Sequence, residues 1–146
     1  MKRLLAIDPG AKGGLAFIDS DGIVQAEKMP EGMTAQVDRL RELKFYIGLD
    51  AAVMEKVGFH VAGNAASSSA KFARHCGHLE AALYTLGIPY DEVLPTKWMK
   101  SMGALPKDKK QRKNAIKETM ARRYPHLKVT LDTADALAIL TWAVEK

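Results

Sequence analysis

The chain has 146 residues, of which 47% are hydrophobic and 27% charged, a balance typical of a folded globular domain rather than a disordered or fibrous chain. No apolar run approaches the ~20 residues that a membrane span requires, so the composition argues against a membrane protein. The single cysteine, Cys76, excludes an internal disulfide and favours a reducing, cytoplasmic setting. We therefore expect one domain over residues 1–146.

The formal charge of +5 is distributed unevenly along the chain. Residues 97–128 contain eleven basic and two acidic side chains and carry +9, whereas the remainder carries −4. A solvated helix face could have such a charge, but few glutamates stand at the i+4 spacing that would neutralise these lysines. A polyanion binds a patch of this kind by releasing condensed counterions, so nucleic acid is the expected partner.

Apolar runs separated by turn residues predict five strands. Pro9-Gly10 and Ser20-Asp21-Gly22 are turn signals that separate the first three runs. The fifth run has the weakest pattern. The predicted strands cover residues 2–7, 14–18, 23–28, 51–55 and 88–93.

Helical periodicity accounts for most of the remaining chain. Thr34 and Thr96 are suitable N-caps, whereas Gly48, Gly87 and Pro125 are suitable stops. The order of the elements predicts an α/β fold, with a five-stranded mixed sheet flanked by helices. The predicted helices cover residues 34–48, 67–86, 96–102, 108–124 and, starting at 131 or 132, the segment that ends at 144.

Four carboxylates stand at positions that suggest a shared role. Asp8 and Glu55 each end a predicted strand, where side chains project into the crevice that α/β folds use for their sites. Asp132 and Asp135 lie at i and i+3 near the start of an apolar helix and therefore share one of its faces. Taken singly, Asp132 could be an N-cap, Asp8 a turn residue, and Glu55 the ion-pair partner of Lys56.

A mixed sheet would bring these four acids together, and that favours a common function. Crowded carboxylates repel one another and normally need cations to neutralise them. Mg²⁺, with Mn²⁺ as a substitute, is the hard cation that oxygen ligands prefer. Two such ions, ~3.5–4 Å apart, can activate water and stabilise the leaving oxygen of a phosphodiester. The basic segment would hold the phosphates.

Other patterns carry less information. His75, Cys76 and His78 suggest zinc, but no second cluster of cysteine or histidine completes four ligands, and Cys76 is interpreted as a buried thiol. Gly13 and Gly14 lack the Gly-Lys-Ser/Thr that a phosphate loop would have, so no nucleotide cofactor is expected. Trp98 and Trp142 stand at apolar helical positions and are interpreted as core residues.

Three segments resemble the RuvC-type Holliday junction resolvases. Residues 6–16, Ala-Ile-Asp-Pro-Gly-Ala-Lys-Gly-Gly-Leu-Ala, resemble the opening of that family. Residues 53–57, Val-Met-Glu-Lys-Val, resemble its strand with the second acid. Residues 132–138, Asp-Thr-Ala-Asp-Ala-Leu-Ala, resemble its terminal acidic helix. The motifs occur in the family's order over nearly the whole chain.

The resemblance implies a ribonuclease H-like fold and a homodimer that nicks two strands of a four-way DNA junction symmetrically. It also implies Mg²⁺-dependent hydrolysis, with two ions per site, that leaves a 5′-phosphate and a 3′-hydroxyl. The helix over residues 67–86 resembles the helix that forms the family's dimer. Matched residue by residue, the catalytic and metal-binding acids are Asp8, Glu55, Asp132 and Asp135.

The basic stretch also has a counterpart in the family, where it precedes the last helix and contacts DNA. Pro95-Thr96-Lys97-Trp98, followed by residues 107–113, resembles that stretch. Phe59 stands where the family often has an aromatic wedge that inserts at the junction centre. The DNA-binding residues expected from the resemblance are Lys107, Lys109, Lys110, Arg112, Lys113 and Phe59.

The short chain is similar to resolvases of phages and prophages, which implies a bacterial cytoplasm as its setting and possible phage origin. Two alternatives stay open. A related ribonuclease H-like nuclease that processes ribosomal RNA precursors also opens with Asp-Pro-Gly, although the long helix and the +9 segment favour the resolvase. A junction-binding module that has lost hydrolysis is the other, and the presence of all four acids argues against it.

Overall fold

The computed structural model describes residues 2–58 and 65–146. In this part of the chain, five strands form one sheet in the order β3-β2-β1-β4-β5. The strands β1, β2 and β3 are antiparallel neighbours, whereas β4 and β5 run parallel to β1. The predicted five-stranded mixed sheet is therefore confirmed. The strands are β1 (Leu4–Asp8), β2 (Gly14–Ile18), β3 (Val24–Lys28), β4 (Ala51–Glu55) and β5 (Tyr90–Val93).

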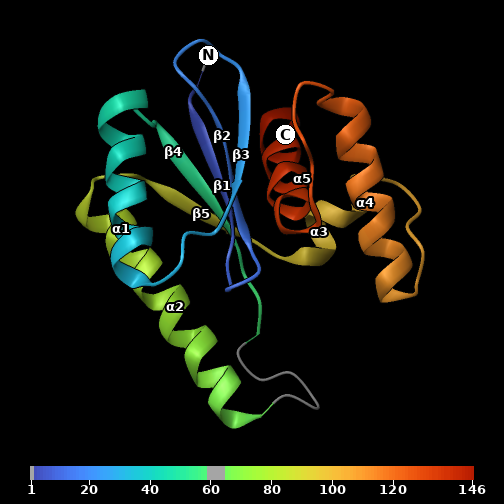
Figure 1. Cartoon of the computed structure of the whole chain (residues 1–146), viewed down its shortest axis with the longest axis horizontal. Helices are drawn as coiled ribbons and strands as arrows, with labels where there is room; N and C mark the ends of the chain where they lie inside the picture. Colours follow the sequence, from blue (N-terminus) through green and yellow to red (C-terminus); the bar gives the residue numbers. More distant parts are fainter. Residues whose placement is uncertain (1, 59–64) are drawn as a thin grey trace.

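Helices cover both faces of this sheet (Figure 1). One face is covered by α1 (Met33–Glu42), its continuation η1 (Leu43–Ile47) and α2 (Ala66–Thr85), which we call the α1/α2 layer. The other face is covered by α5 (Leu131–Glu145), with α3 (Pro95–Lys100) beside it and the basic helix α4 (Lys109–Arg123) packed on its outer side. We call this second set the α5 layer. None of the helices in the described ranges has both the length and the hydropathy needed to cross a membrane.

Alternation along the strands gives the two faces different side chains. In β1 and β2, Leu5, Ile7 and Leu15 point into the α1/α2 layer, whereas Ala6 and Ala16 point toward α5. The small residues on the second face meet further alanines of α5, which is buried along most of its length. Because alanine has almost no side chain, the backbone of α5 can approach the sheet closely.

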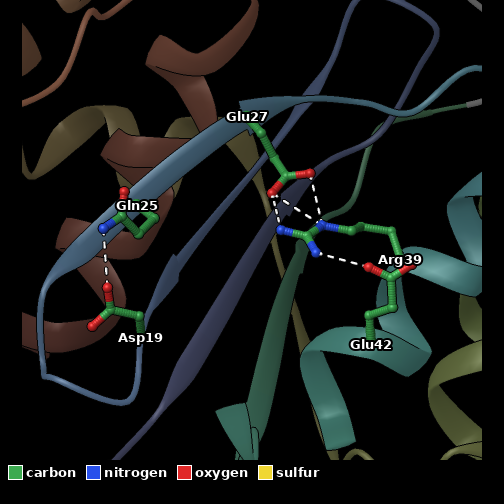
Figure 2. A network of polar contacts seen from close by, with 5 residues as sticks. All are labelled: Asp19, Gln25, Glu27, Arg39 and Glu42. Atoms are coloured by element: carbon green, nitrogen blue, oxygen red, sulfur yellow. Dashed lines mark hydrogen bonds and ion pairs between the residues drawn. The ribbon is translucent and has the colours of Figure 1, made fainter. Parts of the chain in front are cut away.

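An ion-pair network fastens α1 to the edge strand β3 (Figure 2). The guanidinium of Arg39 donates to both carboxylate oxygens of Glu27, with Nη2 to Oε1 at 2.7 Å and Nε to Oε2 at 2.9 Å. It also donates to Glu42 one turn along the helix at 3.0 Å. Such a bidentate pair fixes geometry as well as adding energy, so it sets the position of α1 over the sheet.

Two predicted helix caps were wrong. The N-cap of α1 is Gly32, whose φ of 87° suits a residue without a Cβ, and Thr34 lies inside the helix. The N-cap of α3 is Leu94, because Pro95 begins that helix: its fixed φ and missing N–H suit the first turn. Asp108 is the N-cap of α4, accepting a hydrogen bond from the Gln111 amide at 3.0 Å.

Candidate active site

Two of the four predicted acids end neighbouring parallel strands. Asp8 is the last residue of β1 and Glu55 the last of β4, and the register pairs Ile7 with Met54. Because side chains alternate, Asp8 shares its face with Ala6 and Glu55 shares its face with Val53. Both carboxylates are thereby directed to the α5 side of the sheet.

The start of α5 supplies the other two acids. Thr130 is the N-cap of this helix and forms a capping box with Thr133, so the interpretation of Asp132 as an N-cap is wrong. Asp132 instead lies in the first turn, and Asp135 follows one turn later on the same side. The N-terminus of α5 thus brings two further carboxylates to the ends of β1 and β4. Asp8, Glu55, Asp132 and Asp135 are called the acidic cluster below.

A pair of glycines allows this close approach. A Cβ on Gly14, the first residue of β2, would lie 2.4 Å from the backbone oxygen of Asp132. A Cβ on Gly13 would lie 1.9 Å from the backbone oxygen of Asp8. Neither position can hold a larger residue unless the backbone that carries an acid moves. The glycines predicted not to form a phosphate loop therefore have a packing role beside the acidic cluster.

Burial raises the pKa values of Asp8, Glu55 and Asp135, three members of the acidic cluster. Burial raises the pKa of Asp8 well above its usual range, and the charges of Asp135, Glu55 and Asp132 raise it further. Burial raises the pKa of Glu55 to about 7, with a smaller contribution from Asp135. Burial also raises the pKa of Asp135. Each of these three carboxyl groups is thus held largely out of water, which is typical of a functional site.

Lys113 of α4 is the cation that acts on the largest number of acids in this cluster. Its charge lowers the pKa of Asp8, of Glu55 and of Asp135, and Arg112 contributes to the same lowering at Asp135. Lys113 is exposed to solvent, so it also remains available to a phosphate. Of the residues expected to bind DNA, the structure thus brings Lys113 and Arg112 to the acids.

The remaining predicted DNA-binding residues have other positions. Lys107, Lys109 and Lys110 are exposed around the N-terminus of α4, and the backbone oxygen of Lys107 accepts a hydrogen bond from Arg112 at 2.8 Å. They form a basic approach to the cluster rather than part of it. Phe59 lies outside the described residues.

One polar contact of the site was missed at the sequence level. The indole Nε1 of Trp98 donates a hydrogen bond to Oε2 of Glu55 at 2.6 Å, and both side chains are buried. Trp98 is a core residue, as predicted, but a buried indole N–H needs an acceptor, and the sequence does not identify which one. The proposed ion pair between Glu55 and Lys56 was wrong, because β4 is an inner strand and Lys56 is exposed while Glu55 is buried.

The donor set suits a hard divalent cation. All four members of the acidic cluster offer carboxylate oxygens, and the repulsion that helps to raise the pKa values of Asp8 and Glu55 would be relieved by added positive charge. In the described ranges, no three His, Cys, Asp or Glu side chains are close enough to enclose an ion as they stand. The cluster fits Mg²⁺ or Mn²⁺ by the chemistry of its oxygen donors.

The His75–Cys76–His78 segment of α2 packs against α1. His78 Nε2 lies 2.5 Å from Oε1 of Gln36 on α1, and the two histidine rings meet edge to face with centroids 5.0 Å apart. Burial raises the pKa of the Cys76 thiol to about 11, which keeps it protonated and unreactive. The segment fastens α2 to α1, and the expectation of a buried thiol is confirmed.

Solved structures of Holliday junction resolvases resemble this chain over almost its full length. Thermus thermophilus RuvC in complex with a Holliday junction substrate has a TM-score of 0.64 and 19% identity, covering 99% of this chain and 93% of its own. Ydc2, the yeast mitochondrial Holliday junction resolvase, has a TM-score of 0.55 and 17% identity, covering 97% of this chain and 77% of its own. The fowlpox virus resolvase, in complex with substrate Holliday junction DNA, has a TM-score of 0.54 and 12% identity, covering 98% and 99%.

At such low identities, these likenesses establish the fold: the chain has the ribonuclease H-like fold that its motifs imply. No family model matches the sequence, and comparison with curated proteins gives no significant match.

Proposed function

We propose that this chain is a structure-selective DNA endonuclease, a crossover junction endodeoxyribonuclease, that resolves Holliday junctions and other branched DNA by Mg²⁺-dependent hydrolysis. The observation that carries the proposal is the convergence of Asp8, Glu55 and Asp135 beside Lys113 of a basic helix. Four grouped carboxylates suit divalent cations, and an exposed lysine beside them suits a phosphate. The three structural relatives described above are resolvases, and two of them hold junction DNA.

The roles of the residues follow from their positions. Asp8, Glu55, Asp132 and Asp135 would hold two Mg²⁺ ions, with Mn²⁺ as a substitute. When bound, such ions activate the attacking water and stabilise the leaving 3′-oxygen. Lys113 would contact the phosphate at the reacting strand, and Arg112 would keep the charge of Asp135 balanced. Lys107, Lys109 and Lys110 would bind phosphates of the approaching duplex.

Two symmetric nicks require two active sites. One chain holds one acidic cluster in its described residues, so we propose that a homodimer supplies both sites, one to each strand of the junction. The setting we propose is the bacterial cytoplasm, with the gene belonging either to the cell or to a phage.

A cleavage assay with labelled substrates tests this function. The substrates are a Holliday junction, a Y-fork, a linear duplex and a structured RNA, each with Mg²⁺ and each with EDTA. We expect paired symmetric nicks in the junction, weaker cutting of the fork, and no cutting of the linear duplex or in EDTA. Because the 3′-oxygen is the leaving group, the ends should carry a 5′-phosphate and a 3′-hydroxyl, and rejoining by a ligase checks this.

The same assay separates the competing functions. Cutting of the structured RNA alone would favour a nuclease that processes ribosomal RNA precursors and would overturn the junction proposal. Tight junction binding without any cutting in Mg²⁺ or Mn²⁺ would favour a binding module without hydrolysis. The acidic cluster argues against that second outcome, because four buried or half-buried carboxylates are costly to retain without a ligand.

A further inference from the structure

We infer that Trp98 is a positioning residue for Glu55, holding one carboxylate oxygen through its indole N–H so that the other oxygen is left for a divalent cation. The inference rests on the proposed function, since it assigns Glu55 to the metal-binding set. It adds a residue from outside the acidic cluster and outside the basic stretch to the machinery of the site.

The first observation is the environment of Glu55. Its side chain is only 7% exposed, and among the described residues the Trp98 indole is the one hydrogen-bond donor to its carboxylate. The distance from Nε1 of Trp98 to Oε2 of Glu55 is 2.6 Å. A glutamate has three rotatable side-chain bonds, so a fixed donor removes most of its freedom.

The second observation is how rigidly the donor is held. Trp98 has no exposed surface and packs in the α5 layer with Val53, Val93 and Leu137. The helix that carries it begins one residue after β5, and Val93 at the end of β5 is the register partner of Glu55. The position of Trp98 beneath Glu55 is therefore determined by the sheet itself.

The ends of α3 are fixed as well. The amides of Lys97 and Trp98 donate to the Leu94 oxygen at the start of the helix. At its end, the hydroxyl of Ser101 donates to the Trp98 oxygen at 2.6 Å. These bonds all lie within residues 94–101, so they keep the six-residue helix formed and hold the backbone of Trp98 in helical geometry.

The donor to Glu55 is uncharged. An indole N–H donates a hydrogen bond but carries no charge and cannot accept one. A lysine or arginine in its place would also orient Glu55 but would neutralise it and compete with a cation. An uncharged donor fixes the carboxylate and leaves its full negative charge available. Removing a residue that hydrogen-bonds a metal ligand without touching the metal typically lowers metal affinity or activity by about 10- to 100-fold.

A purely structural role for Trp98 makes a different prediction. If the indole only fills space, an isostere without the N–H has no consequence, and a smaller residue lowers stability alone. The decisive substitution therefore keeps the shape and removes the donor. Site-specific incorporation of 3-benzothienylalanine at Trp98 replaces the N–H by sulfur within the same fused ring. Trp98→Phe is the second variant and loses both the donor and part of the ring.

The readout is Mn²⁺ affinity of the full-length protein without DNA, measured by electron paramagnetic resonance, beside urea unfolding and junction binding. We expect the isostere at Trp98 to weaken Mn²⁺ binding by about 10-fold, with the urea midpoint and the junction affinity unchanged. The matched control is the same isostere at Trp142, whose half-buried ring faces Lys97 and Lys146, whereas the hydrogen bond to Glu55 in the described residues comes from Trp98. There we expect no change in Mn²⁺ binding.

A thermodynamic cycle completes the test. In a Glu55→Gln background, the isostere at Trp98 should have no further effect on Mn²⁺ affinity, because its action passes through that carboxylate. Unchanged Mn²⁺ affinity in the single isostere variant, additive effects in the cycle, or a wild-type protein that binds no Mn²⁺ would each overturn the inference. If the wild type cleaves no branched DNA but the Mn²⁺ results are as expected, the proposed function fails while the role of Trp98 stands.

Discussion

The two faces of the sheet differ in what fills them. The α1/α2 layer packs large aliphatic side chains, such as Leu40, Leu79 and Leu83, against the sheet. The α5 layer packs alanines of α5 against Ala6 and Ala16 and has buried polar groups among them. Large apolar side chains provide burial energy, whereas small ones permit backbones to approach. The proposed chemistry therefore lies on the face where small residues let the backbone of α5 approach the sheet.

The largest effect is expected on the α5 side. Asp8→Asn removes a proposed metal ligand without removing a phosphate contact, so Mg²⁺-dependent junction cleavage should fall at least about 10³-fold, that is by about 4 kcal/mol of activation free energy. Junction affinity in a gel-shift assay should stay within a few-fold of the wild type. Asp38→Asn, an exposed aspartate of α1, is the control and should cleave normally. Mg²⁺-dependent nicking by the Asp8→Asn variant would remove Asp8 from the site.

The converse effect is expected in the α1/α2 layer. Leu79 has no exposed surface, and Leu79→Ala should lower the free energy of unfolding by about 2–5 kcal/mol through lost burial and the cavity that remains. Urea unfolding measures this loss. At a temperature where the variant is folded, its rate of junction cleavage per folded molecule should match the wild type. Selective loss of cleavage in a folded protein would show that the two faces are not separable.

The basic approach to the cluster is expected to act on binding alone. Lys109→Glu combined with Lys110→Glu should weaken junction binding and flatten its dependence on salt, because each lost phosphate contact lowers the log–log slope by about 0.9. A titration between low and moderate salt measures the slope. Arg41→Glu, on the exposed side of α1, is the matched reversal and should leave the slope unchanged. Equal slopes in all three proteins would mean that Lys109 and Lys110 contact no phosphate.

Sequence patterns predicted the fold and the placement of the acids because both depend on local rules. Alternation places Asp8 and Glu55 on one face once β1 and β4 are recognised as parallel neighbours, and helix spacing places Asp132 with Asp135. Other features depend on tertiary geometry. The bond from Trp98 to Glu55 joins residues 43 apart in the chain and depends on how α3 follows β5.

The choice among the lysines also required the structure. Which turn of α4 reaches the acidic cluster depends on how that helix packs on α5, so Lys113 could not be distinguished from Lys109 or Lys110 by spacing alone. The Gly13–Gly14 pair could have been interpreted as a close-packing signal, since neither a phosphate loop nor a positive φ accounts for it. The neighbour of Gly14, the backbone of Asp132, is more than a hundred residues away in the chain and has no sequence signal.

Two glycines provide a finer comparison of the faces. Gly14→Ala places a Cβ 2.4 Å from the Asp132 oxygen, so we expect a loss of about 1–3 kcal/mol in stability together with weaker cleavage. Gly77→Ala in α2 meets no atom within 4 Å and should instead stabilise the protein by about 0.5–1 kcal/mol, since alanine favours helix. Urea unfolding and cleavage of both variants check this. Normal cleavage by Gly14→Ala would mean that close approach of α5 is not needed.

The smallest effect is a pH dependence in which the two faces oppose each other. Burial raises the pKa of Glu55 to about 7, so the folded protein holds that proton more tightly than the unfolded chain does. The resulting stabilisation is fully present below the ordinary pKa of glutamate and is lost as the pH rises to about 7. Burial lowers the pKa of His75 to about 4, with a contribution from His78. Stability from this group is present above pH 6.5 and is lost as the pH falls toward 4.

Between about pH 4.5 and 6.5 the contribution of His75 therefore opposes that of Glu55, and the raised pKa values of Asp8 and Asp135 add to the side of Glu55. Removing one group should expose the other. In EDTA, His75→Gln should become more stable as the pH falls through this window, and Glu55→Gln should become less stable, relative to the wild type. Urea unfolding at several pH values measures the three curves. Three parallel curves would mean that neither Glu55 nor His75 changes its pKa on folding. If those parallel curves also slope with pH, other groups titrate, and Asp8 and Asp135 are the next to replace, because burial raises the pKa of each.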